Sequence, residues 1–176
     1  MRIAAIVGNP LSPSRTRVVA DSFGQVLSEL GGEVATIDLA LIPVDGLAHG
    51  RPEAEAQQGL DTILAADLLL VVTPIYKASY TGLLKLVFDG FQNEALQGKV
   101  AIPVMLGAWP GHLLAIEHSL KPVLAVLGAV PTRGVFVAEH KVDKEAGSVD
   151  AGVIDGFRSV AQEAVRMARA LAGPEE

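Results

Sequence analysis

A continuous apolar run constrains the fold of this chain more than any other feature. Residues Leu68–Val72 read Leu-Leu-Leu-Val-Val, without a polar side chain. Such a run is typical of a strand that is buried on both faces of a parallel sheet. Pro74 has no N–H for a sheet hydrogen bond, so we expect the strand to end there. After Gly82 the apolar spacing becomes helical, and the sequence therefore predicts a strand, a hydroxyl-rich loop and a helix.

Strand-like and helical segments alternate along the whole chain. We expect strands at Ile3–Val7, Val34–Ile37, Leu68–Thr73, Val100–Leu106 and Arg133–Val137. Helical spacing predicts helices from Arg15 to before Gly31, and at Ala54–Ala65, Gly82–Phe91, His112–Leu127 and Val153–Leu171. This alternation predicts an α/β fold, a doubly wound parallel sheet with helices on both faces. Five strands fit the flavodoxin-like order 2-1-3-4-5, although periodicity does not choose it over related orders.

Composition excludes several functional classes. The chain has no cysteine, which rules out disulfides, thiolate catalysis and cysteine-based zinc sites. A formal net charge of −6 argues against a surface that binds nucleic acid or an anionic membrane. His112 and His118 fall on different faces of a helix, so no metal site is expected. Without a linker, a repeat, a signal peptide or an apolar stretch of ~20 residues, we expect one domain over residues 1–176 of a cytoplasmic protein.

The loops after the first, third and fourth strands are expected to meet at one edge of the sheet. Open α/β sheets bind ligands just outside the carboxyl ends of their strands. The first of these loops opens onto a helix, whose free N–H groups favour an anion. Ser12, Ser14 and Thr16 supply hydroxyl groups there, and Arg15 supplies a guanidinium suited to phosphate. A helix cap and solvated arginines would explain the same residues, so this loop alone leaves both interpretations open.

The other two loops combine aromatic side chains with glycine. Tyr76 and Lys77 follow the third strand, where the tyrosine ring could cover a planar ligand or pack on a neighbouring helix or subunit. Gly107 follows the fourth strand, where glycine lets the backbone approach a flat ligand. His112 stands near the next helix start, where it could donate to a ligand or belong to a cap. The coincidence of such residues at three strand ends favours a ligand site.

Pro122 lies inside an otherwise helical pattern. It has no N–H, and its ring would clash with the carbonyl of His118 one turn earlier. A helix can absorb this conflict as an ordinary kink or by widening into a π-bulge, and the sequence by itself favours the kink. The same helix is apolar on more than one side, which predicts a second subunit on its outer side.

Taken together, these segments resemble the NAD(P)H-dependent FMN reductases, in particular the reductase component of two-component alkanesulfonate monooxygenase systems. The resemblance covers nearly the whole chain and is most specific at Thr73–Lys85, Ala95–Val100 and His112–Leu124. It implies a flavodoxin-like fold, NADPH or NADH as the hydride donor, and FMN that is released to a partner monooxygenase. It also implies a homotetramer built from dimers, with a π-helix at a subunit interface in the helix His112–Leu127, where His118 and Pro122 lie.

The residues that the resemblance implies for FMN binding fall into three groups. Those at the phosphate are Ser12, Ser14, Arg15 and Thr16. Those beside the flavin ring are Pro74, Ile75, Tyr76 and Lys77. Those near its polar edge are Gly107, Ala108 and His112. No catalytic residue is expected, because the hydride passes between the two cofactors.

Three functions fit this resemblance. The first is an FMN reductase that uses flavin as a substrate. The second is an oxidoreductase that retains FMN and reduces quinones, azo compounds or chromate. The third is a flavodoxin-like electron carrier without pyridine-nucleotide activity. No 2′-phosphate site is legible, so the sequence does not choose NADPH over NADH.

Overall fold

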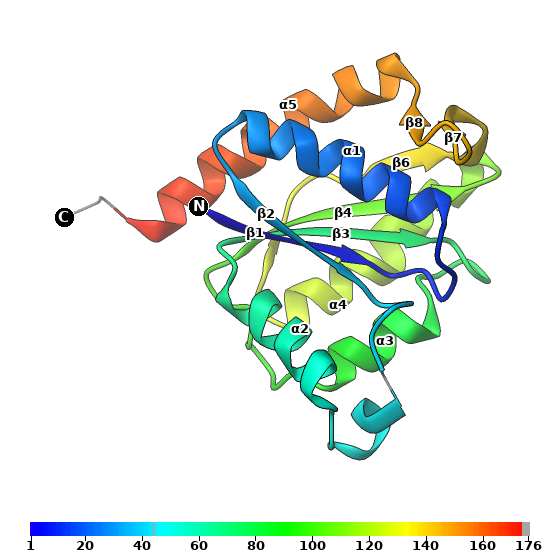
Figure 1. Ribbon diagram of the computed structural model, residues 1–176. Helices are drawn as coiled ribbons and strands as arrows, with labels where there is room; N and C mark the ends of the chain where they lie inside the picture. Colours follow the sequence, from blue (N-terminus) through cyan, green and yellow to red (C-terminus); the bar gives the residue numbers. More distant parts are fainter. Residues whose placement is uncertain (44, 174–176) are drawn as a thin grey trace.

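A parallel sheet forms the central layer of the computed structural model, which describes residues 1–43 and 45–173 (Figure 1). Its first four strands are β1 (Arg2–Val7), β2 (Glu33–Asp38), β3 (Leu68–Pro74) and β4 (Val100–Gly107). They lie in the order β2-β1-β3-β4, and the place beyond β4 is taken by β5 (Val130–Pro131) and β6 (Val135–Ala138). Each of these pairings is parallel. The predicted flavodoxin-like order 2-1-3-4-5 is therefore confirmed.

The prediction of one continuous fifth strand at Arg133–Val137 is wrong. Two short strands occupy that place, and both pair with β4. Gly134 lies between them, at a place where a side chain would collide with Ile116 of the neighbouring helical segment. Arg133 is directed instead to Glu163 at 3.7 Å. The alternation of apolar and polar residues along the sequence could not predict these contacts, because Ile116 and Glu163 belong to helical segments outside the sheet.

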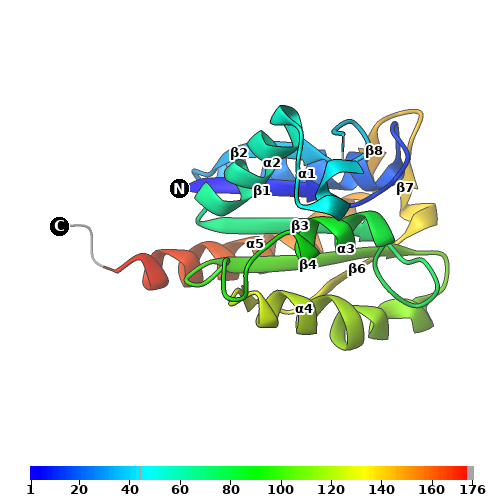
Figure 2. The ribbon, with the colours of Figure 1, turned by 90° about the horizontal axis from the view of Figure 1, so that it is seen from below.

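Helices cover both faces of the sheet (Figures 1 and 2). Two of them, α1 (Arg15–Glu29) and α5 (Ala151–Ala172), share a hydrophobic cluster with one face. The other face packs against α2 (Ala54–Ala65), α3 (Gly82–Asp89) and α4 (Lys121–Val126). Short elements connect the layers: η1 (Asp45–His49), η2 (Pro110–Leu113), η4 (Glu139–Lys141) and an antiparallel hairpin of β7 (Val142–Asp143) and β8 (Ser148–Val149).

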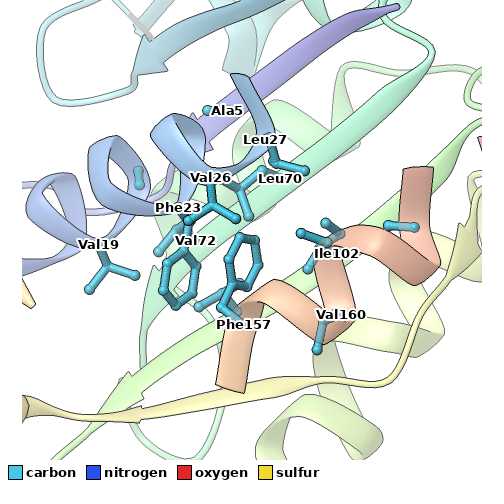
Figure 3. Close-up of a cluster of buried hydrophobic side chains, with 14 of the residues drawn as sticks. Ala5, Val19, Phe23, Val26, Leu27, Leu70, Val72, Ile102, Phe157 and Val160 are labelled. Atoms are coloured by element: carbon cyan, nitrogen blue, oxygen red, sulfur yellow. The ribbon is translucent and has the colours of Figure 1, made fainter. Parts of the chain in front are cut away.

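The core explains the uninterrupted apolar runs. Every residue of β3 and β4 is buried, as predicted for strands covered on both faces. Between α1 and α5, the rings of Phe23 and Phe157 stack with centroids 3.7 Å apart and planes inclined by 5° (Figure 3). Full burial of a side chain of this size stabilises the fold by about 1.5–3 kcal/mol. This packing fixes the sheet that carries the loops of the candidate site.

The segment that contains Pro122 is not the single helix predicted at His112–Leu127. After η2 the chain forms a π-helix, η3 (Ile116–Leu120), and only then α4. The N–H of Lys121 donates to the carbonyl of Ile116, five residues earlier. The extra residue in this turn accommodates a proline that cannot bond to His118. The kink favoured by sequence alone is therefore wrong, and the π-helix implied by the resemblance is present.

Among the described residues, no helix is both long enough and apolar enough to cross a membrane.

Candidate functional site

A pocket of about 210 Å³ opens at the carboxyl edge of the sheet, at the right of Figure 1. The loops after β1 and β3 and the last part of β4 form much of its wall. The lining residues are Asn9, Leu11, Pro13, Ser14, Arg15, Thr16, Pro74, Tyr76, Leu106, Glu139 and Lys144. The structure therefore brings together Ser14, Arg15, Thr16, Pro74 and Tyr76 from the predicted site residues.

The start of α1 presents hydrogen-bond donors to this pocket. Ser14 is the N-cap, and its hydroxyl oxygen accepts a hydrogen bond from the N–H of Arg17 at 3.2 Å. The hydroxyl proton of Ser14 is left to donate to a ligand. The N–H groups of Arg15 and Thr16 lie in the first turn, where a helix offers no carbonyl partner. These donors and the helix dipole suit an anion.

Asn9 and Thr16 hold the first loop in shape. The Asn9 amide donates to Thr16 Oγ1 at 2.9 Å, and its oxygen accepts the N–H of Leu11 at 2.9 Å. Thr16 is only 1% exposed, so its hydroxyl supports the loop from within. Ser12 is directed away from the pocket, because its hydroxyl donates to the carboxylate of Asp38 at 3.2 Å.

The two arginines of the first loop have different surroundings. Arg15 is exposed and lines the pocket, and its Nε donates to the carbonyl of Val142 at 3.4 Å. Among the described residues, its terminal nitrogens have no hydrogen-bond partner. Arg17 pairs with Asp21 at 2.8 Å and with the buried carboxylate of Asp38 at 3.6 Å. Only Arg15 is therefore available to a ligand in the pocket.

A tight turn shapes the loop after β3. The backbones of Tyr76 and Ser79 exchange two hydrogen bonds, of 2.8 and 3.0 Å. Between them, Lys77 and Ala78 have φ angles of 50° and 63°, in the left-handed region that favours glycine and asparagine. Such a conformation costs about 1–2 kcal/mol for an ordinary residue, and strained turns of this kind cluster at functional sites. The turn leaves Tyr76 in the pocket wall, 46% exposed, and Lys77 in solvent.

Two buried threonines tie this loop to the first one. Thr81 donates from its hydroxyl to the carbonyl of Gly8 at 2.6 Å and accepts the N–H of Leu84 at 3.2 Å as the N-cap of α3. Thr73 Oγ1 lies 3.4 Å from the same Gly8 oxygen and accepts the N–H of Thr81 at 3.4 Å. We call Gly8, Thr73 and Thr81 the hydroxyl clasp. Sequence reasoning missed it, although a threonine directly before a predicted helix start is a recognisable cap signal.

The loop after β4 has a different character. Gly107 is buried against Ile75 and the His112 ring, both within contact distance of a side chain placed at that glycine. Ala108 is exposed, and the Trp109 ring stands edge-on to His112 with centroids 5.5 Å apart. These residues adjoin the pocket through Ile75 but do not line it. Trp109 is 64% exposed, so one face of this loop is uncovered in the described chain.

Six lining residues were not predicted from the sequence: the polar Asn9, Glu139 and Lys144, and the apolar Leu11, Pro13 and Leu106. Of the polar residues, Asn9 was read only as part of a turn, and the other two fall in a segment read as a polar loop. Glu139 begins η4, and Lys144 lies in the turn of the β7–β8 hairpin. Lys141, the last residue of η4, directly precedes the hairpin. It donates to Asp150, the N-cap of α5, at 3.0 Å and holds the pKa of that carboxyl below its usual range.

Comparison with known proteins gives consistent matches. A sequence model of the family described as NADPH-dependent FMN reductase matches residues 1–143. An FMN reductase (NADPH) from Pseudomonas putida is 35% identical over 159 residues, which are 89% of this chain and 81% of that protein. The NADH-dependent FMN reductase SfnF of Pseudomonas fluorescens is 36% identical over 151 residues, 79% of this chain and 77% of that protein. The apo crystal structure of the NADH:FMN oxidoreductase EMOB superposes with a TM-score of 0.84 at 29% identity, over 98% of this chain and 91% of that one.

Proposed function

The chain belongs to the NADPH-dependent FMN reductase family, and from this premise we propose that the pocket at the carboxyl edge of the sheet holds FMN while NADPH or NADH reduces it. The protein is an NAD(P)H-dependent FMN oxidoreductase. The observation that carries the assignment is one pocket that joins the start of α1 to the strained turn at Tyr76. A phosphate and a flat ring need these two environments at the two ends of one cleft.

The phosphate end is assigned to the start of α1. Ser14 and the N–H groups of Arg15 and Thr16 would donate to phosphate oxygens, and the Arg15 guanidinium would neutralise charge. Thr16 acts indirectly, because Asn9 holds its hydroxyl inside the loop. Ser12 is given a supporting role through Asp38 rather than a contact with phosphate.

The ring end is assigned to Tyr76 and the Gly107 loop. The pocket of about 210 Å³ is smaller than the roughly 300–1,000 Å³ typical of ligand pockets. The flavin ring would therefore extend along Tyr76 and Pro74 toward Ile75, Gly107 and Ala108, with His112 beside them. Lys77, at the tip of the turn, would approach the ring's polar edge from solvent.

Hydride transfer depends on the relative position of the two rings, and it needs no proton donor or acceptor from the protein. Bound FMN supplies the chemistry, since its ring accepts a hydride from reduced nicotinamide. The chain's own contribution is to orient that ring on Tyr76 and to offer backbone N–H groups to the charge that develops on it. No general acid or base is assigned among the lining residues.

The physiological context is also part of the proposal. The reduced flavin would be passed in the cytoplasm, where NAD(P)H is available, to a flavin-dependent monooxygenase of the alkanesulfonate type. Of the segments that most resemble reductases of such systems, Thr73–Lys85 contains the loop after β3, and His112–Leu124 directly follows the loop after β4. The chain would form one domain and assemble as a dimer of dimers, because Leu113, Leu114 and Trp109 leave an apolar surface exposed beside the π-helix that carries His118.

One experiment separates flavin as substrate from flavin as a retained group. The visible spectrum of the purified protein is recorded first, and NAD(P)H oxidation is then measured with and without added FMN. We expect a colourless protein whose rate depends on free FMN. A yellow protein that reduces quinones without added flavin would overturn this and support the FMN-retaining oxidoreductase.

Replacement of Arg15 by alanine tests the phosphate end. Loss of one charge-assisted bond should weaken FMN binding by about 1.5–3 kcal/mol, measured by fluorescence titration. An unchanged dissociation constant for FMN would remove the assignment of this loop.

A further inference from the structure

The turn of the β7–β8 hairpin adds a cation to the pocket from just outside the segment that the family model matches. The family match ends at residue 143, and Lys144 follows directly, in the turn between the two strands. Lys144 lines the same pocket as Arg15, although 129 residues separate them in the sequence. The fold therefore places two cationic side chains at one end of the pocket.

The hairpin holds the backbone of Lys144 in a defined place. Asp143 accepts the N–H groups of Glu145 and Ala146 at 2.9 Å each, which closes the turn around Lys144. The bond from Arg15 Nε to the Val142 carbonyl connects the hairpin to the start of α1. Val142 itself is buried in the cluster beneath. Lys144 is thus carried on an ordered element beside the helix N-terminus.

The two sides of Lys144 differ in the number of carboxylates around them. Toward the pocket, Lys144 and Arg15 face a single carboxylate, that of Glu139. On the other side the same three residues border a second hollow, where Asp143 and Glu145 add two more carboxylates. An anion is therefore favoured in the pocket and disfavoured in the second hollow. Among the described residues, no ion pair includes Lys144, whereas Lys141, which directly precedes the hairpin, is paired with Asp150.

We propose that Lys144 binds the phosphate monoester of FMN together with Arg15, a role that rests on the proposed function. Such a group carries a charge of about −1.5 to −2 at neutral pH. One guanidinium and a helix end equivalent to roughly +0.5 supply about +1.5. The Glu139 carboxylate in the same pocket offsets part of this charge, and a second cation restores it. The same chemistry occurs in the 2′-phosphate of NADPH, so the experiment must distinguish these two phosphates.

The test compares Lys144→Ala with Lys141→Ala, a matched control three residues earlier in the chain, in titrations with FMN and with riboflavin. Riboflavin has the same ring without the phosphate. We expect Lys144→Ala to weaken FMN binding about 5- to 20-fold, the size of one exposed charge-assisted contact, and to leave riboflavin binding unchanged. Lys141→Ala should change neither. The difference between the variants should shrink at high salt.

Each other outcome overturns the role of Lys144. Equal losses for FMN and riboflavin would indicate a general disturbance of the pocket. An unchanged FMN affinity with a raised KM for NADPH but not for NADH would assign Lys144 to the 2′-phosphate instead. If Arg15→Ala weakens FMN binding and Lys144→Ala does not, only this inference fails. If neither variant weakens it, the proposed phosphate site fails as well.

Discussion

The two sides of the candidate site are built in opposite ways. On the side of β1 and β3, the hydroxyl clasp is buried, and its threonine hydroxyls bond across more than 60 positions of sequence. On the side of β4, the loop from Ala108 to Leu114 exposes its tryptophan and two leucines. The first side fixes the distance between the phosphate loop and the Tyr76 turn. The second leaves these side chains uncovered.

The largest effect should follow from breaking the clasp with Thr81→Val. Valine keeps the shape but removes the hydroxyl, which leaves the Gly8 carbonyl with only the 3.4 Å contact to Thr73 Oγ1 and leaves α3 uncapped. Together these losses should lower the free energy of unfolding by about 2–4 kcal/mol, measured by urea denaturation. FMN affinity should fall as well, because the two loops would no longer be held together.

Thr81→Ser is the control for this change, since serine restores both hydrogen bonds. It should recover most of the lost stability and the flavin affinity. If serine behaves like valine, or if valine has no effect, the clasp does not hold the two loops.

A smaller effect on the same side is expected from Asn9→Ala. The variant loses the bonds to Thr16 and to the Leu11 N–H, which should cost about 1–2 kcal/mol of unfolding free energy. FMN affinity should also decrease, while Ser12→Ala, whose hydroxyl lies outside the pocket, should retain it. A stronger loss of flavin binding in Ser12→Ala than in Asn9→Ala would reverse the roles given to these residues.

The smallest change in chain stability is expected on the open side, from Trp109→Ala. An exposed side chain of this kind should alter the free energy of unfolding by less than about 0.5 kcal/mol. Denaturation at low and at high protein concentration separates the stability of the single chain from the contribution of subunit association. A loss above 1 kcal/mol at low concentration would mean that the loop after β4 is as firmly built as the clasp.

The structure also indicates which features a sequence can reveal. The strand order followed from apolar runs such as Leu68–Val72, because burial on both faces leaves no polar residue. Ser14, Arg15 and Thr16 were found because a helix start after a strand is a local signal, whereas Asn9 was not. The π-helix could not be decided from Pro122 alone, because both a kink and a π-bulge accommodate a proline. Thr73 and Thr81 bond to a carbonyl far away in the chain, and Lys144 lines the pocket beside residues distant in sequence. The cap signal at Thr81 does not reveal such long-range neighbours.

The placement of Trp109 has a practical consequence, because the chain contains a single tryptophan. Its indole stands in solvent beside His112, next to the loops that would border the flavin. All indole emission of the protein therefore originates at one known position. Binding of a yellow chromophore near this indole, or contact of a neighbouring copy of the chain with it, would each change the emission in a different way. The unlabelled protein therefore contains an optical reporter.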